Sequence, residues 1–192
     1  MKLTDKIQKA LNLAANKHNS QMRKSSGHPY IVHPFSVVII LSEYTVDEDI
    51  LTASLLHDLL EDVEGYEYED LEREFGKRVA DIVQGVSEDA DFNNGETDEE
   101  TWQERKDSYL VNLENDSQES LLVCAGDKIH NLKSMMTIYE EMGDRMWEDF
   151  NAPVEKQIWY YEAILRILKE KLRNEIVGEL EQEVDKFKRL MK

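Results

Sequence analysis

The sequence contains little cysteine, proline or glycine. Its 192 residues include one Cys, 3 Pro and 8 Gly. Because Cys124 is alone, no disulfide can form within the chain, which excludes a secreted scaffold held together by internal disulfides. Cys124 lies in the apolar run 121–125, so we expect it in the core. Few prolines and glycines leave few points at which a helix must end, and this favours long helices and an all-α fold.

The chain also lacks long apolar runs and an excess of positive charge. No stretch approaches the roughly 18 apolar residues of a membrane-spanning helix. Residues 1–18 are amphipathic and have no apolar stretch or cleavage site of a signal peptide. The 41 Asp and Glu against 23 Lys and Arg give a net charge of −18, which repels DNA and RNA. We therefore predict a cytoplasmic protein that binds neither a membrane nor a nucleic-acid polymer. A small phosphorylated substrate is compatible if a basic pocket or a metal offsets the field.

Apolar residues make up 41% of the chain, enough for a packed core, and their spacing is helical in most segments. The first predicted helix covers residues 3–18. His28 and His33 each precede a proline, so we expect both at extended positions. Pro34 can then occupy the first turn of a helix that continues through 35–44.

Further along, Asp47 can cap a helix over 48–63, and residues 67–87 are predicted to form two short helices separated near Gly76. The acidic segment 87–100 has no periodicity and is predicted to be a surface loop. A helix follows over 99–113, and another begins at Asp116 or Ser117 and runs to 142; Glu119 is placed for a capping box with Asp116. After Pro153 the chain is predicted to be helical to its end. The sparse apolar positions of that last helix are compatible with packing on the domain or with a homodimer.

The predicted helix over 48–63 carries the strongest chemical signal. Its segment LLHDLLED places His57 four residues before Glu61, and Asp58 four before Asp62. Residues i and i+4 share a helix face, so each histidine or aspartate is paired with a carboxylate. These charges lie among leucines that should be buried, and buried charges need a partner or a metal.

Asp127 presents the same conflict, because it follows the apolar run 121–126, and His33 precedes a helix from which it can project into a cleft. Taken singly, each has a structural explanation: a loop histidine, an isolated His-Asp pair, a salt-bridged aspartate. Taken together, imidazole and carboxylate ligands suit Mn, Fe, Zn, Ni or Co. Such an ion polarises a phosphoryl group, and Glu61 and Asp62 can then orient water or move a proton.

Four segments in this order and spacing resemble the HD hydrolase domain of RelA/SpoT proteins and of the small metazoan SpoT homologues. They are HNSQMRKSSGHPYIVHP, ASLLHDLLEDV, FGKRVADIVQGVS and AGDKIHNLKS, and together they extend from about residue 10 to 135. The resemblance implies an all-α HD-domain fold, with the HD domain in 1–150 and the helices of 151–192 packed on the same domain. It also implies that His33, His57, Asp58 and Asp127 bind the metal, and that Glu61 and Asp62 serve the hydrolytic water.

The resemblance further implies a substrate and its contacts. Members of that group remove the 3′-pyrophosphate from guanosine tetra- or pentaphosphate, usually with Mn²⁺; Fe, Co, Ni, Zn or Mg would be alternatives here. Arg23 would stack on or flank the base, with Lys24 and Ser26 nearby. Asn131 and Ser134 would contact the nucleoside. Lys128 would contact a phosphate, or pair with acidic neighbours. The planar guanidinium of arginine suits stacking, and lysine supplies a point charge.

Some features differ from those relatives and leave other functions open. Lys128 stands where RelA/SpoT chains usually have arginine, and the segment 88–104 is unusually acidic. TWQERKDSYLVNL and IWYYEAIL are similar to a wider set of HD proteins. The first alternative is the same hydrolysis on another nucleotide, such as a 2′-phosphorylated dinucleotide or a nucleoside monophosphate. A second is a catalytically silent HD domain that binds a nucleotide or partner as a regulator, and a third is a purely structural helical protein.

Overall fold

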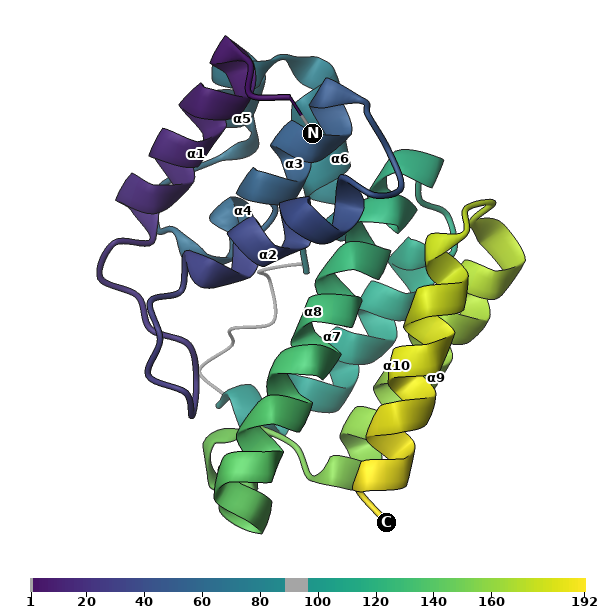
Figure 1. Ribbon diagram of the computed structural model, residues 1–192. Helices are drawn as coiled ribbons and strands as arrows, with labels where there is room; N and C mark the ends of the chain where they lie inside the picture. The colour runs from purple at the N-terminus through teal and green to yellow at the C-terminus, as the bar shows by residue number, and fades with distance from the viewer. Residues whose placement is uncertain (1, 89–96) are drawn as a thin grey trace.

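The computed structural model describes residues 2–88 and 97–192, and these residues are folded almost entirely as helices (Figure 1). Within this part of the chain, pairing of extended backbone is limited to one bridge between Met22 and Pro29. The all-α prediction is therefore confirmed. The elements, in chain order, are α1 (Asp5–Lys17), α2 (Val32–Leu41), α3 (Glu48–Leu56), α4 (Leu59–Asp62), α5 (Tyr68–Phe75), α6 (Lys77–Val86), α7 (Asp98–Leu113), α8 (Gln118–Met142), the 3-10 helix η2 (Gly143–Asp149), α9 (Val154–Lys171) and α10 (Ile176–Leu190).

The long helix α8 forms the centre of the molecule. The N-terminal helices pack at one end of it, and α9 and α10 lie along its other half (Figure 1). Residues 120–127 of α8 are all buried, including Cys124. A Cβ on Gly126 would lie 2.8 Å from Cγ of Leu41, so glycine at this position lets α2 approach α8 closely. That approach places the next residue, Asp127, beside the start of α2.

The expectation that His33 lies at an extended position was wrong. His33 is in the first turn of α2, and its backbone N–H donates to the Tyr30 carbonyl at 2.8 Å. Pro34 follows it within the same turn, where a missing N–H leaves no helical hydrogen bond unmade. The steric preference of a residue before proline is therefore overridden by the packing of α2, and His33 is buried.

The single helix predicted over 48–63 is divided in the structure. Asp47 caps α3 as expected, accepting from the N–H groups of Asp49 and Ile50. The helix ends at Leu56 because the Ser54 carbonyl accepts a hydrogen bond from Nδ1 of His57 at 2.9 Å. An uninterrupted helix would use that carbonyl for the Asp58 N–H. The break leaves His57 and Asp58 in the turn between α3 and α4.

Other local predictions agree with the structure. Gly76, with a φ of 89°, separates α5 from α6. The cap of α8 is Ser117, whose hydroxyl accepts from the Ser120 N–H, rather than Asp116. Most of the acidic segment predicted as a loop, residues 89–96, lies outside the described residues.

The C-terminal helices pack on the rest of the fold. The helix α10 lies against both α8 and α9, and α9 also contacts α7 (Figure 1). Tyr160 and Tyr161 of α9 are buried, whereas Trp159 is partly exposed. Among the described helices, none has both the length and the apolar character needed to cross a bilayer.

Candidate metal centre and substrate cavity

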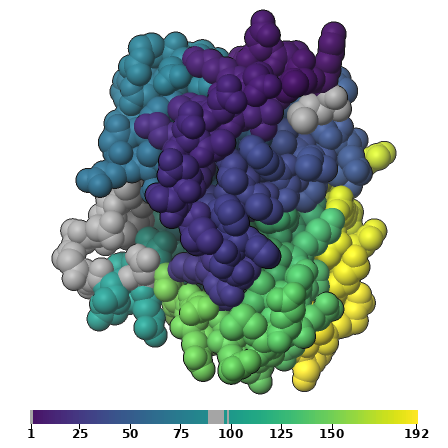
Figure 2. Space-filling model, turned by 60° about the vertical axis from the view of Figure 1, so that its left-hand side comes forward, coloured from purple at the N-terminus to yellow at the C-terminus, as the bar shows by residue number. Residues whose placement is uncertain are grey.

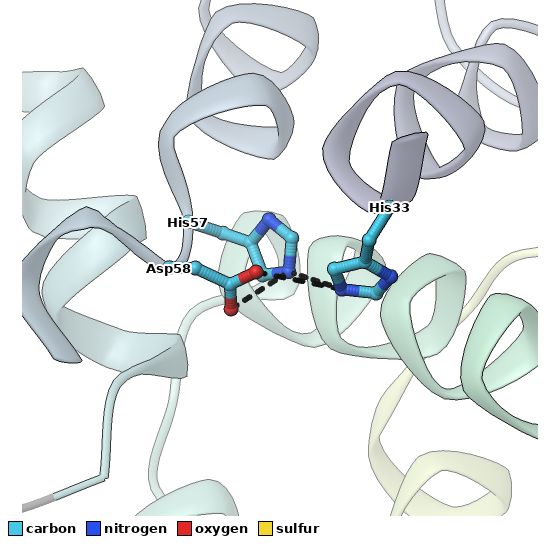
Figure 3. Close-up of side chains that lie close together, drawn as sticks. All are labelled: His33, His57 and Asp58. Carbon is cyan, nitrogen blue, oxygen red and sulfur yellow. Dashed lines mark hydrogen bonds and ion pairs between the residues drawn. The ribbon is translucent and has the colours of Figure 1, made fainter. Parts of the chain in front are cut away.

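His33, His57, Asp58 and Asp127 come together where α2, the α3–α4 turn and α8 meet. Nε2 of His33 lies 3.2 Å from Nε2 of His57 and 3.2 Å from Oδ1 of Asp127. Oδ1 of Asp58 lies 3.2 Å from Nε2 of His57, and Oδ2 of Asp58 lies 3.5 Å from Nε2 of His33. Figure 3 shows the two rings and the Asp58 carboxylate pointing toward one another. One ligand atom from each of His33, His57 and Asp58 falls within 4.8 Å of the others.

Each histidine has its second ring nitrogen engaged away from this cluster. Nδ1 of His57 donates to the Ser54 carbonyl, which leaves Nε2 without a proton in the neutral ring. Nδ1 of His33 lies 2.7 Å from Nδ1 of His130, on the next turn of α8 after Asp127. Metal-binding histidines are usually oriented by such contacts at the other nitrogen. Nε2 of each ring therefore faces the carboxylates, and in a neutral His57 ring this nitrogen has a free lone pair that can bind a metal.

The residues fit a divalent cation. Imidazole nitrogens and ionised carboxylates are all acceptors when the rings are neutral, so their convergence in a buried place needs a positive charge between them. Nε2 of His57 and Oδ1 of Asp127 are 3.9 Å apart, and the four separations given above are 3.2 to 3.5 Å. Such spacings arise when each ligand atom lies about 2.1 Å from one ion. Mixed nitrogen and oxygen ligands define a site for a first-row divalent metal, without fixing which one.

The carboxylates of Asp58 and Asp127 also accept hydrogen bonds from neighbouring side chains. The Tyr30 hydroxyl donates to Oδ2 of Asp58 at 2.8 Å. Lys128 donates to Oδ2 of Asp127 at 2.6 Å, and the Asn131 amide donates to Oδ1 of the same residue. These contacts fix the orientation of both carboxylates before an ion binds, which lowers the cost of assembling the site.

The electrostatics of the cluster keep its carboxylates ionised. Burial opposes the charged form of Asp127, but the Lys128 ammonium and the two histidines hold its pKa well below its usual range. Burial also opposes protonation of His57, yet the Asp58 and Asp127 carboxylates raise its pKa to about 9. Burial lowers the pKa of His33. A protonated His57 balances part of the negative charge that an ion would otherwise balance.

Glu61 and Asp62 lie on α4, at the rim of the cluster. Oε1 of Glu61 accepts from the Glu88 N–H at 2.9 Å, and Oδ2 of Asp62 accepts from the Gln21 amide at 2.9 Å. Both side chains keep an accessible edge. The surrounding protein and the negative charge of Asp58 nevertheless raise the pKa of Glu61 to about 8. A carboxyl group that titrates near neutrality suits proton transfer.

A cavity of about 390 Å³ opens beside Asp62 and Tyr30. Arg23 and Lys24 line it from the loop of residues 18–31, and Asn131 and Ser134 line it from α8. In Figure 2 the dark blue segment that follows the purple N-terminus lies directly against the green surface, which includes the later part of α8. Nη2 of Arg23 donates to Oδ1 of Asn131 at 2.8 Å, so loop and helix are joined across the cavity wall. The structure thus brings these residues, predicted as substrate contacts, into one cavity.

Ser26 lines a neighbouring cavity of about 260 Å³ together with His33 and His130. Arg23 and Ser134 line both cavities. The 18–31 loop is held in place by the hydrogen bonds from Arg23 N–H to the His28 carbonyl and from Tyr30 N–H to the Gln21 carbonyl. Arg23 also lies 5.5 Å from the centre of the Tyr30 ring, a distance typical of a cation–π contact.

Lys128 lies in the interior and borders neither cavity. Its ammonium pairs with Asp127 and lies 5.3 Å from the centre of the Tyr109 ring and 5.8 Å from that of Tyr160. Of the two roles considered for it, the structure therefore shows the pairing with an acidic neighbour.

Several residues around these cavities are not among those expected from the sequence. Tyr30 precedes His33 by three residues and could have been noticed as a partner for the cluster. Lys106, Gln157 and Tyr161 also line the larger cavity, but they come from α7 and α9. Lys106 and Tyr161 lie in the segments TWQERKDSYLVNL and IWYYEAIL, but nothing in the sequence indicated that these segments reach the cavity. His130 of α8 contacts His33.

Residues 10–148 match the HD domain family, and these residues contain all the candidate metal ligands. The chain therefore belongs to the HD domain family.

Several known proteins are similar to it. The chain is 33% identical over 137 residues to the guanosine-3′,5′-bis(diphosphate) 3′-pyrophosphohydrolase of Aquifex aeolicus, which covers 71% of this chain and 19% of that protein. It is 33% identical over 136 residues to the bifunctional (p)ppGpp synthase/hydrolase SpoT of Escherichia coli, covering 68% and 18%. The chain thus spans about a fifth of the length of the curated relatives that it matches.

Among solved structures, a metazoan ortholog of SpoT, described as hydrolysing ppGpp, matches over 100% of this chain and 98% of its own. The TM-score is 0.76 and the sequence identity 27%. The lmo0812 protein of Listeria monocytogenes matches with a TM-score of 0.64 and 29% identity, over 83% of this chain and 96% of that one.

Proposed function

We propose that the protein is a metal-dependent phosphohydrolase that removes the 3′-pyrophosphate of (p)ppGpp. The observation that carries the proposal is the convergence of His33, His57, Asp58 and Asp127 next to a cavity with cationic walls. Membership of the HD domain family and the activities named for its relatives support the same substrate. Mn²⁺ is the metal that we favour, and a cytoplasmic location is compatible with the buried, unpaired Cys124.

In this proposal a divalent ion bound by the two histidines and two aspartates would polarise the phosphoryl oxygens and lower the pKa of the hydrolytic water. The oxygen of that water adds to the phosphorus attached to the ribose O3′. The bond between this phosphorus and O3′ breaks, which releases pyrophosphate and leaves GDP or GTP. Glu61 takes the proton of the water, Asp62 orients it, and one proton is delivered to O3′.

Arg23 and Lys24 hold the nucleotide in the larger cavity. The guanidinium of Arg23 is already oriented by Asn131 and Tyr30, so little order is lost when a base stacks on it. Lys24 is exposed at the cavity edge and supplies charge to a phosphate. Ser26 and Ser134 supply hydroxyl groups for polar contacts with the nucleoside. These local charges offset the net charge of −18 that would otherwise repel an anionic substrate.

We also propose that residues 1–150 carry this chemistry and that residues 151–192 complete the same domain. Gln157 and Tyr161 of α9 line the larger cavity, so the C-terminal helices contribute to its shape. A chain truncated before α9 is therefore expected to bind the nucleotide less tightly.

The direct test is turnover of ppGpp by purified protein with and without Mn²⁺, with products separated by chromatography. Conversion to GDP and pyrophosphate that needs Mn²⁺ and disappears in Asp58→Ala supports the proposal. The variant should be checked for a native-like unfolding transition, because Asp58 is mostly buried.

The same assay separates the alternatives. Cleavage of a different nucleotide, with ppGpp untouched, would keep the HD-domain chemistry and overturn the substrate. Protein that binds nucleotides and metal but hydrolyses nothing in the panel would indicate a regulatory domain. Failure to retain a divalent metal after reconstitution would contradict the metal centre itself.

A further inference from the structure

Lys106 is a cation in the wall of the larger cavity, and no role has been assigned to it although it lies in the segment TWQERKDSYLVNL. It comes from α7, whereas the other cations of that wall, Arg23 and Lys24, come from the 18–31 loop. Its side chain is 16% exposed, so most of it is removed from water while its position still borders the cavity. A lysine on the surface of a solvated helix would be far more exposed.

The partner of Lys106 is the carboxylate of Glu88, which follows α6. Oε1 of Glu88 pairs with the Lys106 ammonium, and Oε2 pairs with Nη1 of Arg105 at 3.1 Å. The Glu88 side chain is 14% exposed. Its backbone N–H donates to Glu61, so this ion pair lies directly behind the carboxylate proposed to handle the water. The wall of the cavity and the rim of the metal cluster are thus connected through one residue.

The surroundings of the Lys106 ammonium contain groups that favour its positive charge and groups that oppose it. The ammonium lies 4.9 Å from the centre of the Tyr160 ring, whose face favours a cation. Burial and the nearby Lys128 lower the pKa of Lys106, although Glu88 opposes this. A weakly solvated cation gains more from a second anion than an exposed cation does, because little water must be removed from it.

Resting on the proposed phosphohydrolase function, we propose that Lys106 binds a phosphate group of the substrate, and that Glu88 is the counter-ion that it exchanges for that phosphate. The cavity, at about 390 Å³, is within the size range of small-molecule sites. Arg105 stays paired with Glu88 when Lys106 turns away, so the carboxylate is not left buried without a cation. Lys106 would then be a specificity residue that favours substrates with a phosphate in this part of the cavity.

The test uses inorganic pyrophosphate as the probe and the full chain freed of metal with a chelator. Calorimetry should show that Lys106→Met binds pyrophosphate about 10- to 100-fold more weakly than the wild type, because a charge-assisted hydrogen bond is lost. Lys77→Met is the matched control. Lys77 also pairs with a carboxylate, that of Asp81, but its side chain is 69% exposed, and it does not border the cavity. Lys106→Gln repeats the test should the methionine variant unfold.

If Lys106 exchanges Glu88 for a phosphate, a change at Glu88 should have the opposite effect on pyrophosphate binding to a change at Lys106. Glu88→Gln should tighten pyrophosphate binding, since Lys106 no longer has to leave a carboxylate, and Asp81→Asn controls for the change in net charge. In the double variant Lys106→Met/Glu88→Gln this gain should disappear. If Glu88 merely positions Lys106, Glu88→Gln would weaken binding instead, and the exchange would be ruled out.

Lys106→Met binding pyrophosphate as tightly as the Lys77→Met control would overturn the proposal, as would a wild type that does not bind pyrophosphate. These outcomes are distinct from failure of the proposed function. A wild type that binds pyrophosphate through Lys106 but does not turn over ppGpp would leave the Lys106 site intact and discard only the (p)ppGpp assignment.

Discussion

Nδ1 of His33 and Nδ1 of His130 lie 2.7 Å apart, although 97 residues separate them along the chain. The contact holds the His33 ring so that Nε2 faces the carboxylates of Asp58 and Asp127. His130 is therefore the partner that orients the ring of a proposed metal ligand.

Removing this partner should weaken metal binding without abolishing it. We expect His130→Ala to lower the affinity for Mn²⁺ by about 10- to 100-fold, the usual effect of losing a residue that orients a metal ligand. Calorimetric titration of the metal-free protein measures this. His28→Ala, which removes an exposed histidine of the loop, should leave the affinity unchanged. Equal affinity in wild type and His130→Ala would show that the ring of His33 is held by its packing alone.

The carboxylates of α4 should affect turnover more than binding. Glu61→Gln is expected to lower kcat by about 100-fold or more, because a positioned proton acceptor contributes that much to hydrolysis. Asp62→Asn should lower kcat as well, since Asp62 is held by Gln21 at the edge of the cavity. In both variants nucleotide affinity should stay within about threefold of wild type. Glu64→Gln, an exposed change in the next turn, is the control. A rise in KM at constant kcat would assign Glu61 to substrate binding instead.

The buried ion pair of Lys128 and Asp127 should contribute more to the stability of the metal-free protein than to that of the metal-bound protein. Their side chains are 12% and 11% exposed, so Lys128→Met leaves the Asp127 carboxylate buried without its cation. We expect the free energy of unfolding to fall by about 3 to 5 kcal/mol without metal. Mn²⁺ should restore part of this loss by supplying a positive charge, and urea unfolding with and without the ion measures both. An equal loss in the two conditions would separate Lys128 from the metal cluster.

Two helical glycines, one in close contact with another helix and one in open space, allow a controlled test of helix packing. Gly126→Ala places a Cβ 2.8 Å from Leu41 and should destabilise the fold by about 1 to 3 kcal/mol. Gly178→Ala in α10 meets no atom within 4 Å and should stabilise it by about 0.5 to 1 kcal/mol. Thermal unfolding distinguishes the two. Similar effects of both changes would mean that α2 and α8 can separate without cost.

Asp116 should make stability depend on pH in a defined window. Burial raises its pKa to about 6, and Oδ2 has no hydrogen-bond partner among the described residues. A folded pKa above the unfolded value near 3.8 means that the carboxyl group costs stability as pH rises from about 4 through 6. Asp116→Asn should therefore match wild type near pH 4 and exceed it by about 1 kcal/mol at pH 7, an amount reduced by partial exposure. A difference that does not change with pH would refute this origin.

Much of the helical framework could be predicted from local patterns. Asp47 caps α3, Gly76 separates α5 from α6, and the apolar run before Asp127 forms the buried part of α8. Each of these features depends on residues within a few positions of one another, and caps, left-handed glycines and apolar periodicity act at that range. The ligand types were visible for the same reason, because charged groups among leucines conflict with burial at the level of the sequence.

Predictions from local sequence were wrong at positions where tertiary packing opposes the local backbone preference. His33 is helical despite the proline after it, and the helix predicted through 48–63 is broken at His57 and Asp58. The break depends on a side chain competing for the Ser54 carbonyl. The position of the His57 ring depends on its contacts with α2 and α8, which the local sequence does not show.

The sequence by itself determined the helical class, most helix boundaries, and which side chains carry charge into an apolar interior. The tertiary structure alone decided that Lys128 turns inward to Asp127, that Arg23 meets Asn131 across 108 positions, and that Lys106 of α7 borders the same cavity. The physical reason is the distance along the chain over which each kind of interaction acts. Helix formation and capping depend on neighbours within a turn or two, whereas the direction of a charged side chain is fixed by partners that only the packing of distant helices brings within reach.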